Sequence, residues 1–223
     1  MTNKSLERTT FEGLSRLYVI ALSTIALSIV ISQILVQRHL SNQLDDSRVV
    51  NVAGRQRMLS QKITKEILLL QKQEEQPLSD LDETLQLWIN SHIALQEGNK
   101  ELGLPKNESP TIKVMFQELK PYFETISKNA KSIIQQQESK RDSISIQKEV
   151  EEILINESPF LEQMDRIVFQ FDREAREKVN KLRRTELLLL LAALFILILE
   201  LLFIFRPAAV QVRKTIRELV DAK

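Results

Sequence analysis

The chain has 223 residues, a formal net charge of +1, four glycines, six prolines and no cysteine. Its near-zero charge and 5% aromatic content provide neither a basic surface for phosphates nor a stacking platform, so nucleic acid is not expected as a partner. The lack of cysteine excludes disulfides and thiolate metal sites, and the scarcity of glycine and proline favours long helices over an all-β fold.

The first predicted element is an apolar run over residues 17–36, which contains no charged residue. Its length matches the roughly 20 residues that a helix needs to cross the hydrocarbon core of a bilayer. The helical pattern continues past Val36 into charged sequence, which a cleaved signal peptide would not do. We therefore expect a cytoplasmic tail over residues 1–16 and an uncleaved transmembrane helix over residues 17–36.

Helical periodicity continues through the middle of the chain. Apolar residues recur at helical spacing from Ser47 to Lys72, so the first helix is expected to extend to about Pro77. A second helix is predicted to begin near Ser79 and to end at Gly98, and a third to cover residues 111–139. Pro121 is expected to kink the third helix or to lie where that helix is already interrupted. A fourth is expected to start between Asp142 and Pro159 and to continue into a second apolar run.

Each of the four helices carries one apolar stripe, and four such stripes bury one another most simply in an antiparallel four-helix bundle. The predicted fold is therefore all-α, with breaks near Pro77, Gly103 and Pro159 arguing against one extended coiled coil. The apolar residues that form these stripes are Val50, Leu59, Ile63, Ile67 and Leu70; Leu81, Leu85, Trp88, His92 and Leu95; Val114, Leu119, Phe123, Ile126 and Ile133; and Leu161, Met164, Ile167, Val168, Phe171, Ala175, Val179 and Leu182.

The second apolar run, residues 187–205, predicts a second transmembrane helix followed by a cytoplasmic connector helix over residues 206–223. Glu200 is its one charged residue, expected to reach the interface or to face a partner helix. The alternative is that Glu200 makes a polar contact between paired spans that transmits the signal. Basic residues flank both runs on their terminal sides, which places both termini in the cytoplasm and residues 37–186 in the periplasm.

Residues 46–62 depart from a simple apolar stripe because they place a glycine and three arginines within a helix. A glycine in a helix interior costs about 1 kcal/mol relative to alanine, so the close approach of another backbone or of a ligand is expected to compensate for Gly54. Val50, Gly54, Arg57 and Gln61 fall on one face of the helix by their three-and-four spacing.

A two-fold dimer through this face would bring two Arg57 side chains together, and an anion between them would offset their repulsion. The competing interpretation is that Arg55 and Arg57 are ordinary solvated residues. Under that interpretation they pair with nearby carboxylates, namely Asp45, Asp46 or Glu66.

Four segments in the same order give the chain a family resemblance: NVAGRQRMLSQKITKE at 51–66, WINSHIALQEG at 88–98, SPTIKVMFQELKPYFETI at 109–126 and FLEQMDRIVFQFDREAREKVNKLRR at 160–184. Together they resemble the type IV pilus methyl-accepting chemotaxis transducer N-terminal domain (PilJ-type), a family related to nitrate/nitrite sensor kinases. The resemblance implies a dimeric periplasmic sensor in a bacterial inner membrane that feeds a histidine kinase, a diguanylate cyclase or a chemotaxis module.

In the nitrate/nitrite sensors the arginine that precedes the methionine of this segment holds the anion, and the resemblance carries that role to Arg57. The segment here differs in composition from theirs, which makes nitrate one candidate among small anions. The expected ligand-binding residues are Asn51, Gly54, Arg57, Met58 and Gln61.

Catalysis is not expected, and neither is a cofactor. His39 and His92 are the only histidines, too few for a metal cluster, and no glycine-rich phosphate loop occurs. The expected partners are a second copy of the chain, a small anion, membrane lipid, and a cytoplasmic output domain or partner protein. The alternative function is a membrane-tethered scaffold that recognises another protein rather than a small molecule.

Overall fold

The computed structural model describes residues 2–72, 78–138 and 146–221. These residues are α-helical apart from one π-helical turn and short connections, and they contain no β-strand, only an isolated bridge between Asn99 and Leu104. The chain forms two compact units. The bundle unit is Ser41–Lys178, and the terminal unit combines Met1–Leu40 with Val179–Lys223.

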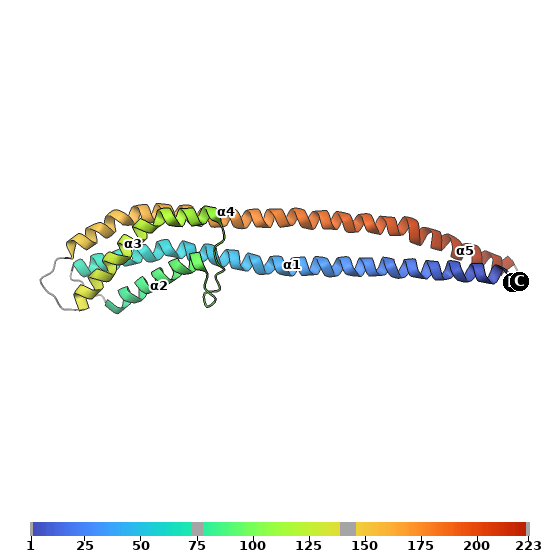
Figure 1. Cartoon of the computed structure of the whole chain (residues 1–223), viewed down its shortest axis with the longest axis horizontal. Coiled ribbons are helices and arrows are strands. Elements are labelled where there is room, and N and C mark those ends of the chain that lie inside the picture. The colour runs from blue at the N-terminus through green and yellow to red at the C-terminus, as the bar shows by residue number, and fades with distance from the viewer. Residues whose placement is uncertain (1, 73–77, 139–145, 222–223) are drawn as a thin grey trace. The chain divides into compact units, whose positions relative to one another are not determined.

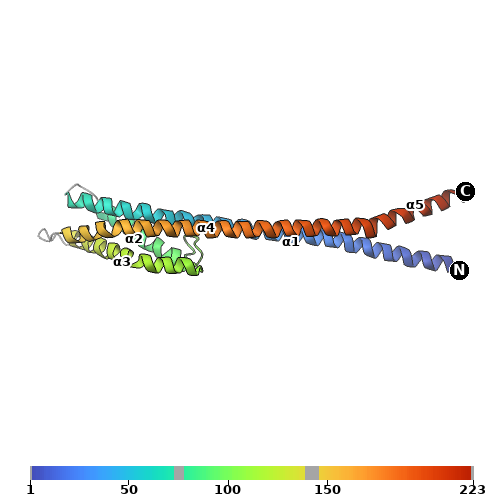
Figure 2. The same cartoon turned by 90° about the horizontal axis from the view of Figure 1, so that it is seen from above.

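Four helices build the bundle unit: α1 (Thr2–Gln71), α2 (Leu78–Glu97), α3 (Pro110–Glu138) and α4 (Gln147–Glu200), of which α1 and α4 also extend into the terminal unit. Within the bundle unit successive helices run in opposite directions (Figures 1 and 2). The predicted all-α fold and its up-and-down order are confirmed. The predicted helix end at Pro77 and the earliest predicted start of the fourth helix, at Asp142, lie outside the described residues.

The α1 seam, the buried row of this helix, follows a heptad pattern with alternating steps of four and three residues. Its members are Val49, Ala53, Gln56, Ser60, Ile63 and Ile67. The centre of the seam is therefore small or polar, and Gln56 is 0% exposed. Neither amide atom of Gln56 has a hydrogen-bond partner among the described residues.

Aromatic side chains from the other three helices fill the middle of the core. The Trp88 ring lies 4.6 Å from that of Phe123 on α3 and 5.1 Å from that of Phe160 on α4. His92, one turn further along α2, stacks on Phe123 at 3.7 Å and meets Phe116 edge-on at 5.3 Å. Burial lowers the pKa of His92 from its ordinary 6.5 to about 3, so the ring is a neutral packing element, as its place in the α2 stripe predicted.

The structure corrects three details of the predicted pattern. Val114 is exposed rather than buried, because the buried row of α3 passes through Ile112, Phe116 and Leu119 instead. Pro121 and Pro159 interrupt neither helix. Pro121 faces solvent, where water can satisfy the carbonyl that the missing N–H leaves free.

The terminal unit contains two helices long and apolar enough to cross a membrane, judged by length and composition alone. One corresponds to Tyr18–Arg38, and the other lies in the continuous helical segment that ends α4 and includes the π-helical turn η1 (Leu201–Phe205) and α5 (Arg206–Asp221). This turn was not predicted from the sequence, and in it the Arg206 N–H donates to the Leu201 carbonyl. Glu200 precedes η1 and is buried.

Candidate functional site

An open groove of about 640 Å³ lies between α1 and α4 in the bundle unit. Both helices contribute residues at spacings of three, four and seven, so one face of each helix lines it. The lining residues are Gly54, Arg57, Met58 and Gln61 from α1, and Ser158, Leu161, Glu162 and Asp165 from α4. Four of the five predicted ligand-binding residues therefore meet at one site.

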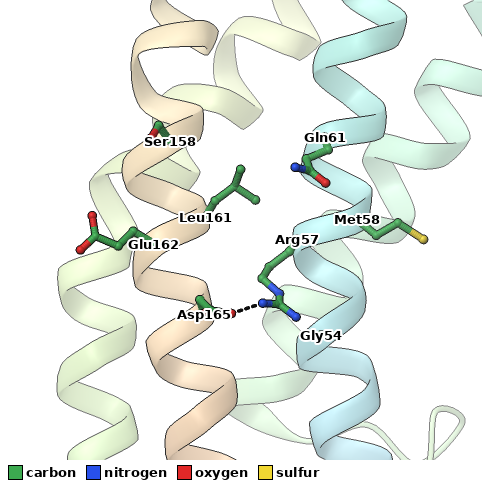
Figure 3. Close-up of a pocket in the computed structure, with 8 residues that line it drawn as sticks. All are labelled: Gly54, Arg57, Met58, Gln61, Ser158, Leu161, Glu162 and Asp165. Carbon is green, nitrogen blue, oxygen red and sulfur yellow. Dashed lines mark hydrogen bonds and ion pairs between the residues drawn. The ribbon is translucent and has the colours of Figure 1, made fainter.

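The charged centre of the groove is an ion pair between the guanidinium of Arg57 and the carboxylate of Asp165 (Figure 3). The two side chains are 40% and 39% exposed, so water and ligands reach both of them. An ion pair with this exposure contributes at most about 1 kcal/mol to stability. The pair therefore holds Arg57 in place but opens at small cost.

This pairing overturns the expected partners of Arg57. Glu66 lies 3.5 Å from Lys62, and Asp46 accepts a 2.7 Å hydrogen bond from Lys178 on α4. Arg57 instead crosses to α4, because its position on α1 points at the facing helix rather than along its own. Arg55 is exposed and lies outside the groove lining.

Gly54 lies at the same end of the groove as Arg57 (Figure 3). A Cβ atom added to it would meet no heavy atom within 4 Å, apart from the local backbone of its own helix. Packing within the chain therefore does not require glycine at this position. The space beside Gly54 is open to a ligand or to a second molecule.

The remaining lining residues differ in direction. The Leu161 side chain points from α4 toward α1, while Met58 points away from α4 and Glu162 away from α1 (Figure 3). The Glu162 carboxylate accepts a 2.7 Å hydrogen bond from Arg166. The fifth predicted residue, Asn51, lies in a neighbouring groove of about 660 Å³ that also includes Gly54, Arg55 and Met58.

A smaller groove of about 390 Å³ continues along the same two helices and shares Gln61 with the first. Glu157 lines it together with Thr64, Lys65 and Lys72. Burial raises the pKa of the Glu157 carboxyl, and the Thr64 hydroxyl opposes that shift. This groove is a less polar extension of the Arg57 site.

Residues 39–148 match the family described as "PilJ: Type IV pili methyl-accepting chemotaxis transducer N-term". The chain carries a PilJ-type domain. The match covers the bundle part of α1, all of α2 and α3, and the first residues of α4. This part of the chain is thus a sensory domain of the chemoreceptor type.

Among solved structures, the ligand-binding domain of the P. aeruginosa nitrate receptor McpN aligns with 57% of this chain and 96% of its own length, at 22% sequence identity and a TM-score of 0.49. No curated protein matches the chain in sequence.

The sequence pattern did not identify the roles of Gln56 and Asp165 in the bundle unit. Gln56 sits in the α1 seam, where its amide breaks the apolar periodicity by which buried positions are predicted. Asp165 lies 108 residues from Arg57 and beyond the family match. Only the pairing of α1 with α4 identifies it as the partner.

Arg48 is an exposed residue of α1 that reaches the connection between α2 and α3. The Arg48 guanidinium donates to the Gly103 carbonyl at 3.4 Å, and Gly103 has a positive φ of 62°. The contact attaches the connection between α2 and α3 to α1. Among the described residues, no group of three or more histidine, aspartate or glutamate side chains is arranged to hold a metal ion.

Proposed function

We propose that the chain is the ligand-sensing and transmembrane signalling part of a bacterial receptor, with its bundle unit in the periplasm and its spans in the inner membrane. Arg57 holds a negatively charged group of the ligand. The observation that carries this proposal is the half-exposed guanidinium of Arg57 in a groove, retained by one weak ion pair. A guanidinium presents a planar fork of donors that matches a carboxylate or a nitrate ion.

A second copy of the chain is the proposed partner on the outer sides of α1 and α4. Leu44, Asn51 and Met58 recur every seven residues along α1, and Ile155 and Phe169 are fourteen residues apart on α4. All but Asn51 are large, exposed apolar side chains, with Phe169 66% exposed. Heptad spacing is the pattern by which helices of two molecules pack together. A two-fold dimer through these outer sides would cover the exposed apolar side chains of both copies.

Signalling follows from the continuity of two helices. Both α1 and α4 continue from the bundle unit into the terminal unit without a break. A ligand that favours one arrangement of α1 and α4 biases the segments that enter the membrane. The shift at equilibrium is limited by the difference in the ligand's affinity for the two arrangements. The output is a histidine kinase, a diguanylate cyclase or a chemotaxis module.

A scaffold function is the second candidate, and the same exposed apolar residues favour it. Phe169 and Ile155 would then contact another protein's periplasmic domain instead of a second copy. Under that function no small molecule would act through Arg57.

The test uses the full chain in lipid nanodiscs and measures the thermal unfolding midpoint with nitrate, nitrite, acetate and the common amino acids. A ligand at 100 times its dissociation constant adds about 2.7 kcal/mol of apparent stability. The proposal expects at least one compound to raise the midpoint, with the rise lost in Arg57→Ala and kept in Arg55→Ala. If every compound leaves the wild type unchanged, or if Arg57→Ala responds like wild type, Arg57 is not the ligand site.

A further inference from the structure

We infer that the groove between α1 and α4 takes a zwitterion, a molecule that carries both a carboxylate and an ammonium group, as an α-amino acid does. The inference rests on the proposed function, because it assigns a ligand class to the same Arg57 site. The charges that the groove presents are its first support.

Three of the eight lining residues are charged: Arg57, Glu162 and Asp165. Glu162 points away from α1 and is bound to Arg166 on its own helix (Figure 3). The charges available to a ligand are therefore one guanidinium and one carboxylate. They lie in direct contact and are about equally exposed, at 40% and 39%.

An ion that carries only negative charge meets a conflict at this pair. To bind the Arg57 guanidinium it must displace the Asp165 carboxylate or share the guanidinium with it. Either arrangement places two negative groups side by side, and the repulsion between like charges offsets the new contact.

A zwitterion meets no such conflict. Its carboxylate takes the guanidinium of Arg57, and its ammonium donates to the Asp165 carboxylate. One ion pair within the chain is replaced by two between chain and ligand, each strengthened by full charges on donor and acceptor. The arrangement selects molecules in which the two charges are close together.

The uncharged part of the groove suits the rest of such a molecule. Gly54 leaves open space beside the ion pair, and Leu161 offers an apolar contact between the two helices. Gln61 and Ser158 lie further along the groove and supply an amide and a hydroxyl for a polar side chain. A volume of about 640 Å³ lies within the range of small-molecule sites, which runs from about 300 to 1,000 Å³.

The experiment compares each amino acid with its two half-molecules by isothermal titration calorimetry, using the full chain in nanodiscs. For alanine these are propionate, which lacks the ammonium, and ethylammonium, which lacks the carboxylate. We expect at least one amino acid to bind at least about tenfold more tightly than either of its halves, since each lost charged hydrogen bond costs that much or more.

Asp165→Asn provides the decisive variant, with Glu162→Gln as its matched control. Removing the carboxylate should weaken amino-acid binding by about tenfold and strengthen binding of the deaminated acid by at least about threefold. Glu162→Gln should leave both constants within about twofold, because its side chain points out of the groove. An unfolded protein could not gain affinity, so the gain separates a lost contact from a lost fold.

The outcomes distinguish this inference from the proposed function. If simple anions bind through Arg57 and no amino acid binds more tightly than its deaminated half, the zwitterion is excluded while Arg57 remains the ligand site. The zwitterion is also excluded if Asp165→Asn leaves amino-acid binding unchanged. If a compound binds equally well to wild type and Arg57→Ala, the proposed function fails.

Discussion

Replacing Gly54 by alanine should stabilise the protein and impair its ligand response. Gly54 is inside α1, where alanine is favoured over glycine by about 0.8–1.0 kcal/mol. The added Cβ meets no heavy atom within 4 Å beyond the local helix backbone, so no steric penalty offsets that gain. The free energy of unfolding should rise by about 1 kcal/mol, and the thermal midpoint by about 3 °C.

The same methyl group occupies the open space beside Arg57, so ligand affinity should fall. Chemical denaturation of the full chain in detergent micelles gives the free energy, and calorimetry gives the affinity. Gly98→Ala is the matched control, because Gly98 has a φ of 82° and an added Cβ would lie 2.7 Å from the Lys106 backbone nitrogen. That variant should lose stability. A loss of stability in Gly54→Ala would contradict this expectation, as would a gain in stability that leaves ligand affinity intact.

Three further changes test the core and its charges. Gln56→Met should raise the free energy of unfolding, measured by denaturant titration, by about 1–3 kcal/mol, because it removes two buried amide atoms that have no partner among the described residues. An unchanged or lower free energy of unfolding would contradict this. Trp88→Ala should lower the free energy of unfolding by about 3–5 kcal/mol, since the indole ring fills the aromatic core. A loss below about 1 kcal/mol would show that the core is packed differently. Burial lowers the pKa of His92 from 6.5 to about 3, so the folded state resists protonation of this ring. The free energy of unfolding is therefore highest above pH 6.5 and decreases as the pH falls toward 3. Between pH 7 and pH 5 this loss should be about 2 kcal/mol, and it should be absent in His92→Gln.

The position of a helix could be predicted best where the sequence shows both one apolar stripe and a glycine that ends the helix. The predicted α2 ends at Gly98, and the structure ends it at Glu97 with a positive φ on that glycine. Leu81, Leu85, Trp88, His92 and Leu95 are all buried as their spacing indicated. The effect of the prolines was predicted less well, because Pro121 and Pro159 stay within helices that tertiary packing holds.

The site was only half predictable, for a physical reason. Gly54, Arg57 and Gln61 share a face of one helix, and their spacing along the sequence is enough to predict this. Asp165 belongs to α4, and its meeting with Arg57 depends on how two distant segments pack. The polar centre of the α1 seam was missed for a related reason, because Gln56 and Ser60 look solvent-facing until the neighbouring helices cover them.

Binding of the ligand by Arg57, in the groove between α1 and α4, can be observed directly. The most direct measurement is a crystal structure of the full chain with the compound that raises its thermal midpoint most. Ligand density is expected within hydrogen-bond distance of the Arg57 guanidinium and between the two helices, with Asp165 contacting the ligand. Density that lies elsewhere, while Arg57 still bonds only to Asp165, would contradict this expectation.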